Sequence, residues 1–200
     1  MKLIMENWRE YLDDSSPLNV VYFGGFKPPH KGHAAIVEEY LSMPDVKRVF
    51  IMFGWSPRKS DDGTVILDDR HARRAWELIV PTLSDPSRVI IAPVTKGNTM
   101  VRAAEMAWDN KLSGERITAG FGAKEPYYGE TFMKIIDSLA ASKGPPAARP
   151  VMVSTNINIP SISASKIRNA AAVRDMETLS AAIPDEVSVE DYLNVLLEDP

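Results

Sequence analysis

Five short apolar runs recur along the chain, and each has the length of a β-strand. They cover residues 19–23, 48–53, 88–92, 116–121 and 151–154. Most are apolar at consecutive positions, which is typical of strands covered on both faces. The residues between and after these runs follow the 3.6-residue period of amphipathic helices. The helical stretches are residues 31–42, 68–83, 98–110, 127–142, 163–172 and 189–197.

The alternation of strand and helix predicts the architecture. A strand, a helix and a second strand in succession form a right-handed crossover, which places the two strands parallel in one sheet. Repeated crossovers give an α/β fold, so we expect a doubly wound parallel sheet of five strands with helices on both faces. Because 200 residues with 44% hydrophobic composition suit one core, residues 19–200 should form a single domain. Residues 1–18 are expected to add an N-terminal helical extension.

Composition and charge narrow the classes of partner. A formal net charge of −4 gives no global basic field, so nucleic acid and anionic membranes are not expected partners. No run approaches the ~18 apolar residues that a membrane span needs, and the N-terminal residues are too charged for a secretory signal. The chain has no cysteine, which excludes disulfides, thiolate metal sites and cysteine nucleophiles. We expect a cytoplasmic protein.

The segment after the first predicted strand offers the clearest candidate chemistry. It reads GGFKPPHKGH over residues 24–33. In open parallel sheets, ligands bind beyond the carboxyl ends of the strands, where this segment should lie. Gly24 and Gly25 allow a ligand to approach the backbone closely. The next helix should begin near His30, with free N–H groups and the positive end of its dipole directed into the cleft, which predicts an anion site.

Two of the chain's three histidines, His30 and His33, stand three residues apart in this first helical turn. At that spacing both side chains can reach the same group, and Gly32 between them leaves the backbone open. Imidazoles there can donate to phosphate oxygens and stabilise charge on a bridging oxygen. The alternative is a metal pair, but an i,i+3 histidine pair without a nearby carboxylate is a poor divalent site. We therefore expect phosphate binding and no protein metal site; His71 should lie on the surface.

A second segment, PSISASKIRNA over residues 160–170, follows the last predicted strand. Ser163 and Ser165 stand where they can cap a helix and offer hydroxyls. Arg168 follows one turn later with a planar guanidinium suited to phosphate. Taken alone, a capped helix with a surface arginine is the simpler interpretation.

Together, His30-Lys31-Gly32-His33 and the ISASKIR run at residues 162–168 resemble the nucleotidyltransferase superfamily. Its hallmarks are an H-x-G-H motif after the first strand and an I-S-S/T-x-x-R motif after the last, and cytidylyltransferase-like and nicotinamide-nucleotide adenylyltransferase-like enzymes are among its members. The resemblance covers residues 19–172. It implies a Rossmann-like sheet in the order 3-2-1-4-5. It also implies Mg²⁺-dependent transfer of a nucleoside monophosphate to a phosphate-bearing acceptor, with pyrophosphate leaving and no covalent enzyme intermediate.

The resemblance implies roles for individual residues. His30 and His33 would contact the triphosphate and stabilise the transition state, while Ser163, Ser165 and Arg168 would hold the β- and γ-phosphates. The remaining nucleotide-binding candidates are Phe23, Gly24, Gly25, Phe26, Lys27, Gly32, Gly120 and Gly122. The last two, after the fourth predicted strand, would supply backbone contacts to the base. Lys124 departs from the family pattern, because relatives often have an acidic residue there.

Acceptor-binding candidates follow the second predicted strand, in residues 56–63, which we expect to form a mobile loop near the site. Family members often place a basic residue here, so Arg58 or Lys59 could meet the acceptor phosphate or the triphosphate; a solvated loop charge is the alternative. Trp55 could stack on an acceptor ring or anchor a lid in the core. Arg70, on the polar side of the next helix, could reach the acceptor or simply face solvent.

The resemblance implies adenylyl transfer from ATP to a small phosphorylated acceptor such as a pyridine mononucleotide. In the family, the IxSxSxxR-type ending is commoner on members that transfer adenylyl than on those that transfer cytidylyl groups, and Trp55 with the loop at residues 55–59 favours a pyridine ring as the acceptor. The alternatives are a cytidylyltransferase acting on an alcohol phosphate and a non-catalytic nucleotide-binding or sensor module. An aminoacyl-tRNA synthetase domain shares the H-x-G-H chemistry, but this acidic chain lacks the room and charge for tRNA. Relatives form dimers to hexamers, which leaves a homo-oligomer open.

Overall fold

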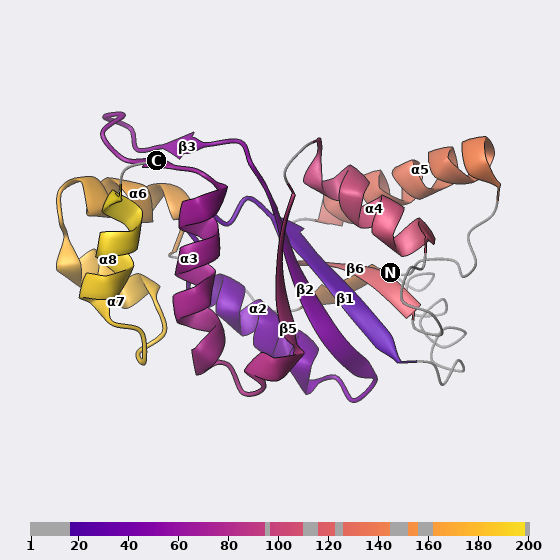
Figure 1. The fold of residues 1–200 in the computed structure, drawn as a ribbon, viewed down its shortest axis with the longest axis horizontal. Helices are drawn as coiled ribbons and strands as arrows, with labels where there is room; N and C mark the ends of the chain where they lie inside the picture. The colour runs from indigo at the N-terminus through magenta and orange to yellow at the C-terminus, as the bar shows by residue number, and fades with distance from the viewer. Residues whose placement is uncertain are drawn as a thin grey trace.

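A single twisted sheet organises the molecule (Figure 1). The computed structural model describes residues 17–94, 97–109, 116–122, 126–144, 152–155 and 162–198. The strands of this sheet are β1 (Leu18–Gly24), β2 (Val46–Gly54), β5 (Val89–Val94), β6 (Arg116–Gly122) and β7 (Met152–Thr155). They lie in the order β5-β2-β1-β6-β7, and every neighbouring pair is parallel.

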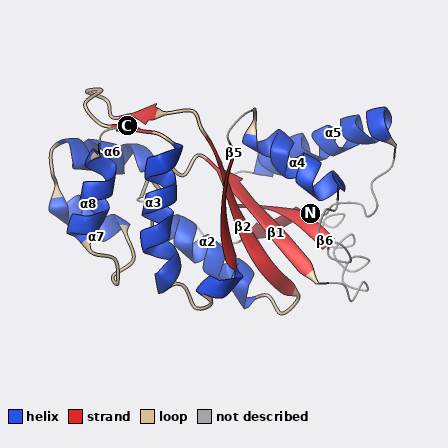
Figure 2. Cartoon of the chain, viewed as in Figure 1, coloured by secondary structure: helices blue, strands red, loops and turns tan. Residues whose placement is uncertain are grey.

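Helices cover both faces of this sheet (Figure 2). They are α2 (Lys31–Ser42), α3 (Asp69–Ile79), α4 (Thr99–Asp109) and α5 (Pro126–Lys143). Side chains of β1 alternate between the faces: Val20 packs with α2 and α3, whereas Val21 packs with α4 and α5. This period of two divides the apolar strand residues between two hydrophobic clusters, one on each side of the sheet.

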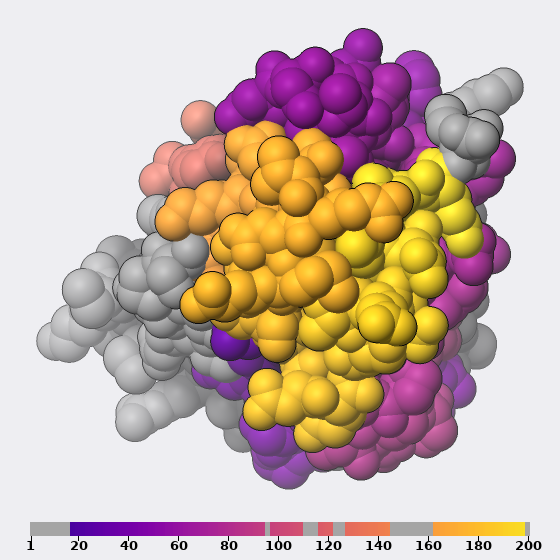
Figure 3. Space-filling model, turned by 90° about the vertical axis from the view of Figure 1, so that its left-hand side faces the viewer, coloured from indigo at the N-terminus to yellow at the C-terminus, as the bar shows by residue number. Residues whose placement is uncertain are grey.

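Three further helices pack on the α2 and α3 side: α6 (Ala164–Ala172), α7 (Met176–Ala182) and α8 (Val189–Leu197). Two-residue strands, β3 (Arg58–Lys59) and β4 (Ile66–Leu67), form an antiparallel hairpin, and two 3-10 turns, Val80–Thr82 and Pro86–Arg88, follow α3. Figure 3 views the molecule from the side on which α6, α7 and α8 lie. The purple segment that contains the hairpin lies there directly against the orange α6. The C-terminal helices therefore join the region that follows β2.

The predicted α/β architecture, a parallel sheet flanked by helices, is confirmed for the strands β5-β2-β1-β6. The predicted helices over 31–42 and 189–197 coincide with α2 and α8, but α7 was not predicted, and residues 56–63 contain β3 rather than forming a plain loop. The predicted helical extension over residues 1–18 lies almost wholly outside the described residues. Within the described part of the chain, no helix has the length and apolar character needed to cross a membrane.

Candidate functional site

The loop that leaves β1 sends neighbouring side chains to opposite sides. Phe26 has a φ of 43°, in the left-handed region that a bulky residue rarely adopts. Its ring is buried against Tyr22 and Trp76, with centroids 4.7 Å and 5.6 Å away. The Phe26 side chain therefore belongs to the core. The residue can contact a nucleotide only through its backbone atoms. The next residue, Lys27, lines a cavity at the carboxyl end of the sheet.

The two histidines form the N-terminal cap of α2. The Gly32 N–H donates to His30 Nδ1 at 3.1 Å, and the His30 N–H donates to His33 Nδ1 at 3.2 Å. This reciprocal capping box satisfies donors that the first helical turn would leave without partners. The imidazole rings stack with centroids 3.7 Å apart, so the structure brings the predicted pair together.

These caps fix which imidazole nitrogens can bind a ligand. A nitrogen that accepts a hydrogen bond has no proton, so each neutral ring has its proton on Nε2. Burial, together with the neighbouring His30, lowers the pKa of His33 well below its usual value of 6.5. His33 is therefore neutral at physiological pH and offers a single Nε2–H donor.

The segment that contains Ser163 and Arg168 forms the start of α6. Ser163 Oγ accepts a hydrogen bond from the Lys166 N–H at 3.3 Å and so caps the helix. Arg168 donates from Nη2 to Ser165 Oγ at 2.9 Å. Both serines are exposed, so their hydroxyls are also accessible to a ligand.

Arg168 joins three segments of the chain. Its Nη1 donates to the Lys27 carbonyl at 2.6 Å, and its Nε donates to the Lys59 carbonyl at 2.7 Å. Burial and the nearby Arg58 lower its pKa from the usual arginine value. Arg168 therefore brings the loop after β1, strand β3 and helix α6 to one place, and each of these segments contains predicted site residues.

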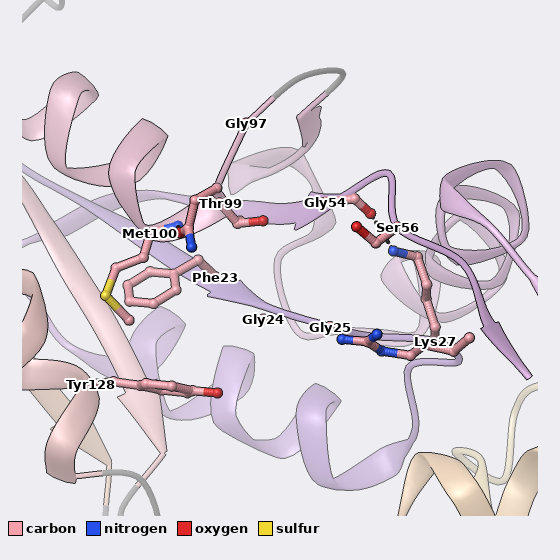
Figure 4. A pocket seen from close by; sticks show the side chains of 12 residues that line it. Phe23, Gly24, Gly25, Lys27, Gly54, Ser56, Gly97, Thr99, Met100 and Tyr128 are labelled. Carbon is pink, nitrogen blue, oxygen red and sulfur yellow. Dashed lines mark hydrogen bonds between the residues drawn. The ribbon is translucent and has the colours of Figure 1, made fainter.

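A cavity of about 310 Å³ opens beside this junction (Figure 4). Its lining comes from the end of β1 and the loop after it, from the end of β2 and from β3, and from the starts of α4 and α5. It consists of Phe23, Gly24, Gly25, Lys27, Gly54, Ser56, Arg58, Gly97, Asn98, Thr99, Met100 and Tyr128. Ligands bind at this edge in doubly wound folds. Phe23 and Tyr128, with ring centroids 6.1 Å apart, give the cavity an aromatic end. Lys27 and Arg58 give it a cationic one.

Lys27 and the exposed Lys59 differ sharply in environment. Lys27 is only 4% exposed, and its ammonium donates to the carbonyl of Gly54. Burial and the nearby Arg58 lower its pKa to about 8, against a smaller opposite effect of Asp69 and Asp68. Lys59 holds Arg168 through its backbone carbonyl.

The other predicted acceptor-binding residues lie around this junction. Trp55 is 51% exposed, so the core-anchor alternative is wrong and its ring is accessible for stacking. Arg70 is exposed beside Asp68, with its Nε 3.1 Å from Oδ2, and does not line the cavity.

The surface position expected for His71 is wrong. The side chain is 3% exposed, because it completes a capping box with Asp68 at the start of α3. Its Nδ1 lies 2.6 Å from Asp68 Oδ1, and its Nε2 lies 3.1 Å from the Glu198 carbonyl. His71 therefore joins α3 to the end of α8 and does not face the site.

The two glycines predicted to contact the base both lie in β6. Gly120 lies within β6 beneath Tyr40, where a Cβ atom would come 2.6 Å from the Tyr40 hydroxyl and 2.7 Å from Val20 Cγ1. Close packing therefore explains why a glycine occupies position 120. Gly122 ends β6, paired with Thr155. Lys124 lies outside the described residues.

Sequence reasoning missed part of the cavity wall and one tether. Asn98 and Thr99 enter the cavity from the start of α4, and Asn98 Oδ1 caps that helix by accepting from the Met100 N–H at 2.8 Å. Asn169 joins α6 to the hairpin: it accepts from the Asp61 N–H at 2.9 Å and donates to Asp61 Oδ2 at 2.7 Å. An asparagine directly before a stretch of helical periodicity in the sequence indicates such a cap. The sequence around Asn169 has no pattern that indicates its contact with Asp61.

The described residues do not form a metal centre of their own. Among them, no group of three or more His, Asp or Glu side chains is placed to hold an ion. The charges nearest the cavity are those of Lys27 and Arg58, and these repel cations. A divalent ion at this site would therefore arrive with a phosphate-bearing ligand.

No family model and no curated protein matches the sequence. Solved structures do match the fold. The nicotinic acid mononucleotide adenylyltransferase of Plasmodium falciparum, complexed with APC, matches with a TM-score of 0.54 and 13% identity over 88% of this chain and 94% of that one. The bifunctional NMN adenylyltransferase/ADP ribose pyrophosphatase of Francisella tularensis, complexed with AMP and a manganese ion, matches with a TM-score of 0.53 and 13% identity over 87% of this chain.

A second structure of the Francisella tularensis enzyme gives the same TM-score of 0.53, over 88% of this chain. The chain spans less than half of the bifunctional enzyme, 44% and 46% in the two structures. At this identity the likeness shows the fold. The chain therefore shares the fold of these structures, in which a parallel sheet is flanked by helices.

Proposed function

We propose that this protein is a nucleotidyltransferase that moves AMP from ATP to the phosphate of a small acceptor such as a pyridine mononucleotide. A phosphate oxygen of the acceptor would attack the α-phosphorus of ATP and form the new bond. The bond from that phosphorus to the bridging oxygen of the β-phosphate would break in line, and pyrophosphate would leave with its electron pair. The displacement needs no side-chain nucleophile.

One observation carries this proposal more than any other. Arg168 donates directly to the Lys27 carbonyl, 141 positions away in the sequence, and so joins the two motif segments at the carboxyl end of the sheet. If the helix with Ser163 and Arg168 and the turn with the two histidines had unrelated roles, nothing would require this contact between them. The parallel pairing of β7 with β6 also supports the family order 3-2-1-4-5, with β7 as the fifth strand.

The proposed chemistry divides between positioning and charge stabilisation. The α2 N-terminus and the Nε2–H donors of His30 and His33 would bind the triphosphate and neutralise charge on the bridging oxygen. The guanidinium of Arg168 and the hydroxyls of Ser163 and Ser165 would hold the β- and γ-phosphates. Mg²⁺ would enter as the complex of ATP, because the residues at this site provide cations and donors rather than carboxylates.

The reverse reaction tests base and acceptor together. Purified protein is incubated with Mg²⁺, pyrophosphate and, separately, NAD, nicotinate adenine dinucleotide, dephospho-coenzyme A, FAD or a CDP-alcohol, and nucleoside triphosphate formation is measured. We expect ATP from a pyridine dinucleotide and none with His33→Ala. Formation of CTP from a CDP-alcohol would identify a cytidylyltransferase instead. Binding of ATP without any turnover in this panel or in a forward screen for pyrophosphate release would identify a sensor.

A further inference from the structure

A buried positive charge lies at the wall of the cavity, hydrogen-bonded to a carbonyl rather than to a carboxylate. Lys27 is the buried lysine of the described residues, at 4% exposure, and its ammonium meets the carbonyl of Gly54 instead of an acidic side chain. Burying an unpaired charge is costly. An ammonium has three donors, and among the described residues Gly54 accepts one of them, so two can serve a ligand.

The position of this ammonium separates it from the histidine pair. The Lys27 side chain reaches across to the end of β2, and Figure 4 shows its ammonium beside Gly54 and Ser56 at the cavity wall. The ring of His33 packs 4.9 Å from Phe26 of the core cluster. Lys27 lines the cavity and neither histidine does, so the ammonium and the histidine pair have different surroundings.

The shape of the cavity indicates what the ammonium would bind. Arg58 shares the cationic end, while Phe23, Met100 and Tyr128 form an apolar end within the same 310 Å³. A ligand with an aromatic ring at one end and a phosphate at the other would satisfy both ends. The geometry points to Lys27 Nζ as the group that binds and positions the phosphate of the acceptor. This assignment rests on the proposed function and adds to it.

The charges around Lys27 make this role visible in a pH profile. Arg58 faces it from β3, Asp68 and Asp69 act on it from the start of α3, and Arg168 holds its carbonyl from α6. The second pKa of a phosphate monoester is about 6, so the ligand is already a dianion between about pH 7 and 9. Lys27, with a pKa of about 8, loses its charge within this window.

Binding of simple phosphates tests the assignment without any turnover. The probes are nicotinamide mononucleotide and ribose 5-phosphate, titrated calorimetrically into the wild type, Lys27→Met and Lys27→Arg at pH 7 and pH 9.5. We expect Lys27→Met to weaken both probes by about 100-fold at pH 7, the scale for a lost buried charge contact. The wild type should weaken at pH 9.5, whereas Lys27→Arg should bind equally at both values because arginine stays charged.

A matched control and a second readout keep this test decisive. Lys134→Met removes a charge from an exposed position on α5 and should leave probe binding unchanged. Circular dichroism establishes that each variant is folded, and Lys27→Gln replaces Lys27→Met if the latter is not. Equal probe binding by the wild type and Lys27→Met, or a loss at pH 9.5 that persists in Lys27→Arg, would overturn the assignment.

Turnover separates this assignment from the proposed function. In an active enzyme, Lys27→Met should raise the KM for the acceptor and leave the KM for ATP within about twofold, and kcat/KM for the acceptor should fall above pH 8. An equal rise in the KM for ATP would place Lys27 at the triphosphate and contradict the assignment. A protein that binds ribose 5-phosphate through Lys27 yet transfers nothing would retain this site and refute the transferase.

Discussion

Lys27 links the pH dependence of stability to the candidate site. Its pKa is about 8 in the folded protein and near 10.5 when exposed, so between these values the unfolded chain binds more protons. Folding stability attributable to this residue therefore rises with pH from 8 to 10.5, and below pH 8 the full cost of burying the ammonium is present. We expect the wild type to gain about 1–2 kcal/mol relative to Lys27→Met across that window, allowing for solvent screening at the cavity wall.

Urea unfolding of both proteins at pH 7, 8.5 and 10.5 measures this difference. Subtracting one unfolding free energy from the other removes the contributions of groups that titrate alike in both proteins. A constant gap between the two curves would mean that the lysine has an ordinary pKa in the folded protein.

His30 has a structural role and a proposed chemical role that can be separated. Its Nδ1 caps α2, and the proposal assigns the Nε2–H donor to the triphosphate. Asparagine is an equally good N-cap but has no donor at that place. His30→Asn should keep the stability of the wild type while kcat/KM falls about 10²- to 10³-fold. His30→Ala should lose the same activity and also about 1 kcal/mol of unfolding free energy, because the cap is lost.

Steady-state kinetics and denaturant unfolding of the two His30 variants give these numbers. Unchanged kcat/KM in a stable His30→Asn protein would restrict His30 to the capping role.

At the scale of elements, the packing of α2 on β6 depends on Gly120. Tyr40 of α2 lies directly over it, and its hydroxyl donates to the Phe121 carbonyl at 3.3 Å. Gly120→Ala should therefore destabilise the protein by about 1–3 kcal/mol, the range for overpacking a filled site. Thermal unfolding measures the loss. Gly25→Ala is the matched control, because a Cβ there meets nothing within 4 Å and should cost far less.

The β3–β4 hairpin is held against α6 by a short polar contact. Asn169→Ala removes both hydrogen bonds to Asp61 and should loosen the hairpin, which Arg168 still holds through the Lys59 carbonyl. Loss of about 1 kcal/mol of local stability corresponds to roughly fivefold faster amide exchange at Ser60 and Gly63, with little change in global unfolding. Hydrogen exchange followed by NMR detects this change. Asn194→Ala, at an exposed position on α8, should leave those amides unchanged.

The strands of this hairpin and helix α7 were not predicted from the sequence, because they are short. Strands of two residues are too short for a period of two, so β3 and β4 leave no pattern in the sequence. The seven residues of α7 complete about two helical turns, which is also too little for a periodic signal. Longer elements such as α2 and α8 were predicted to the residue, because each has a polar cap and an apolar stripe.

Across the whole molecule, the sequence predicted which segments meet better than it predicted where their side chains point. The motif segments at 24–33 and 162–168 were predicted to share a site, and the structure brings them together. Phe26 was placed among nucleotide contacts, yet its direction depends on a φ of 43° that no pattern reveals. The contribution of Thr99 and Met100 to the cavity depends on how α4 packs against β2, which only the tertiary fold determines.

Tyr192 of α8 reaches the candidate site from the far end of the chain. It is fully buried, and its hydroxyl donates to the carbonyl of Pro29, one residue before the α2 cap. Tyr192→Phe removes this donor and should lower the unfolding free energy by about 1 kcal/mol, measured in urea. Tyr127→Phe, on a side chain that is 56% exposed, should change it far less.

The contact between Tyr192 and Pro29 also has a consequence for synthesis of the protein. The ribosome makes Pro29 long before Tyr192, so the β1 loop emerges without the side chain that later holds it. A nascent chain arrested after Ala172 would have both motifs but not this support. Ligand binding at the candidate site should therefore arise late in translation, when α8 has left the exit tunnel and docked against the β1 loop.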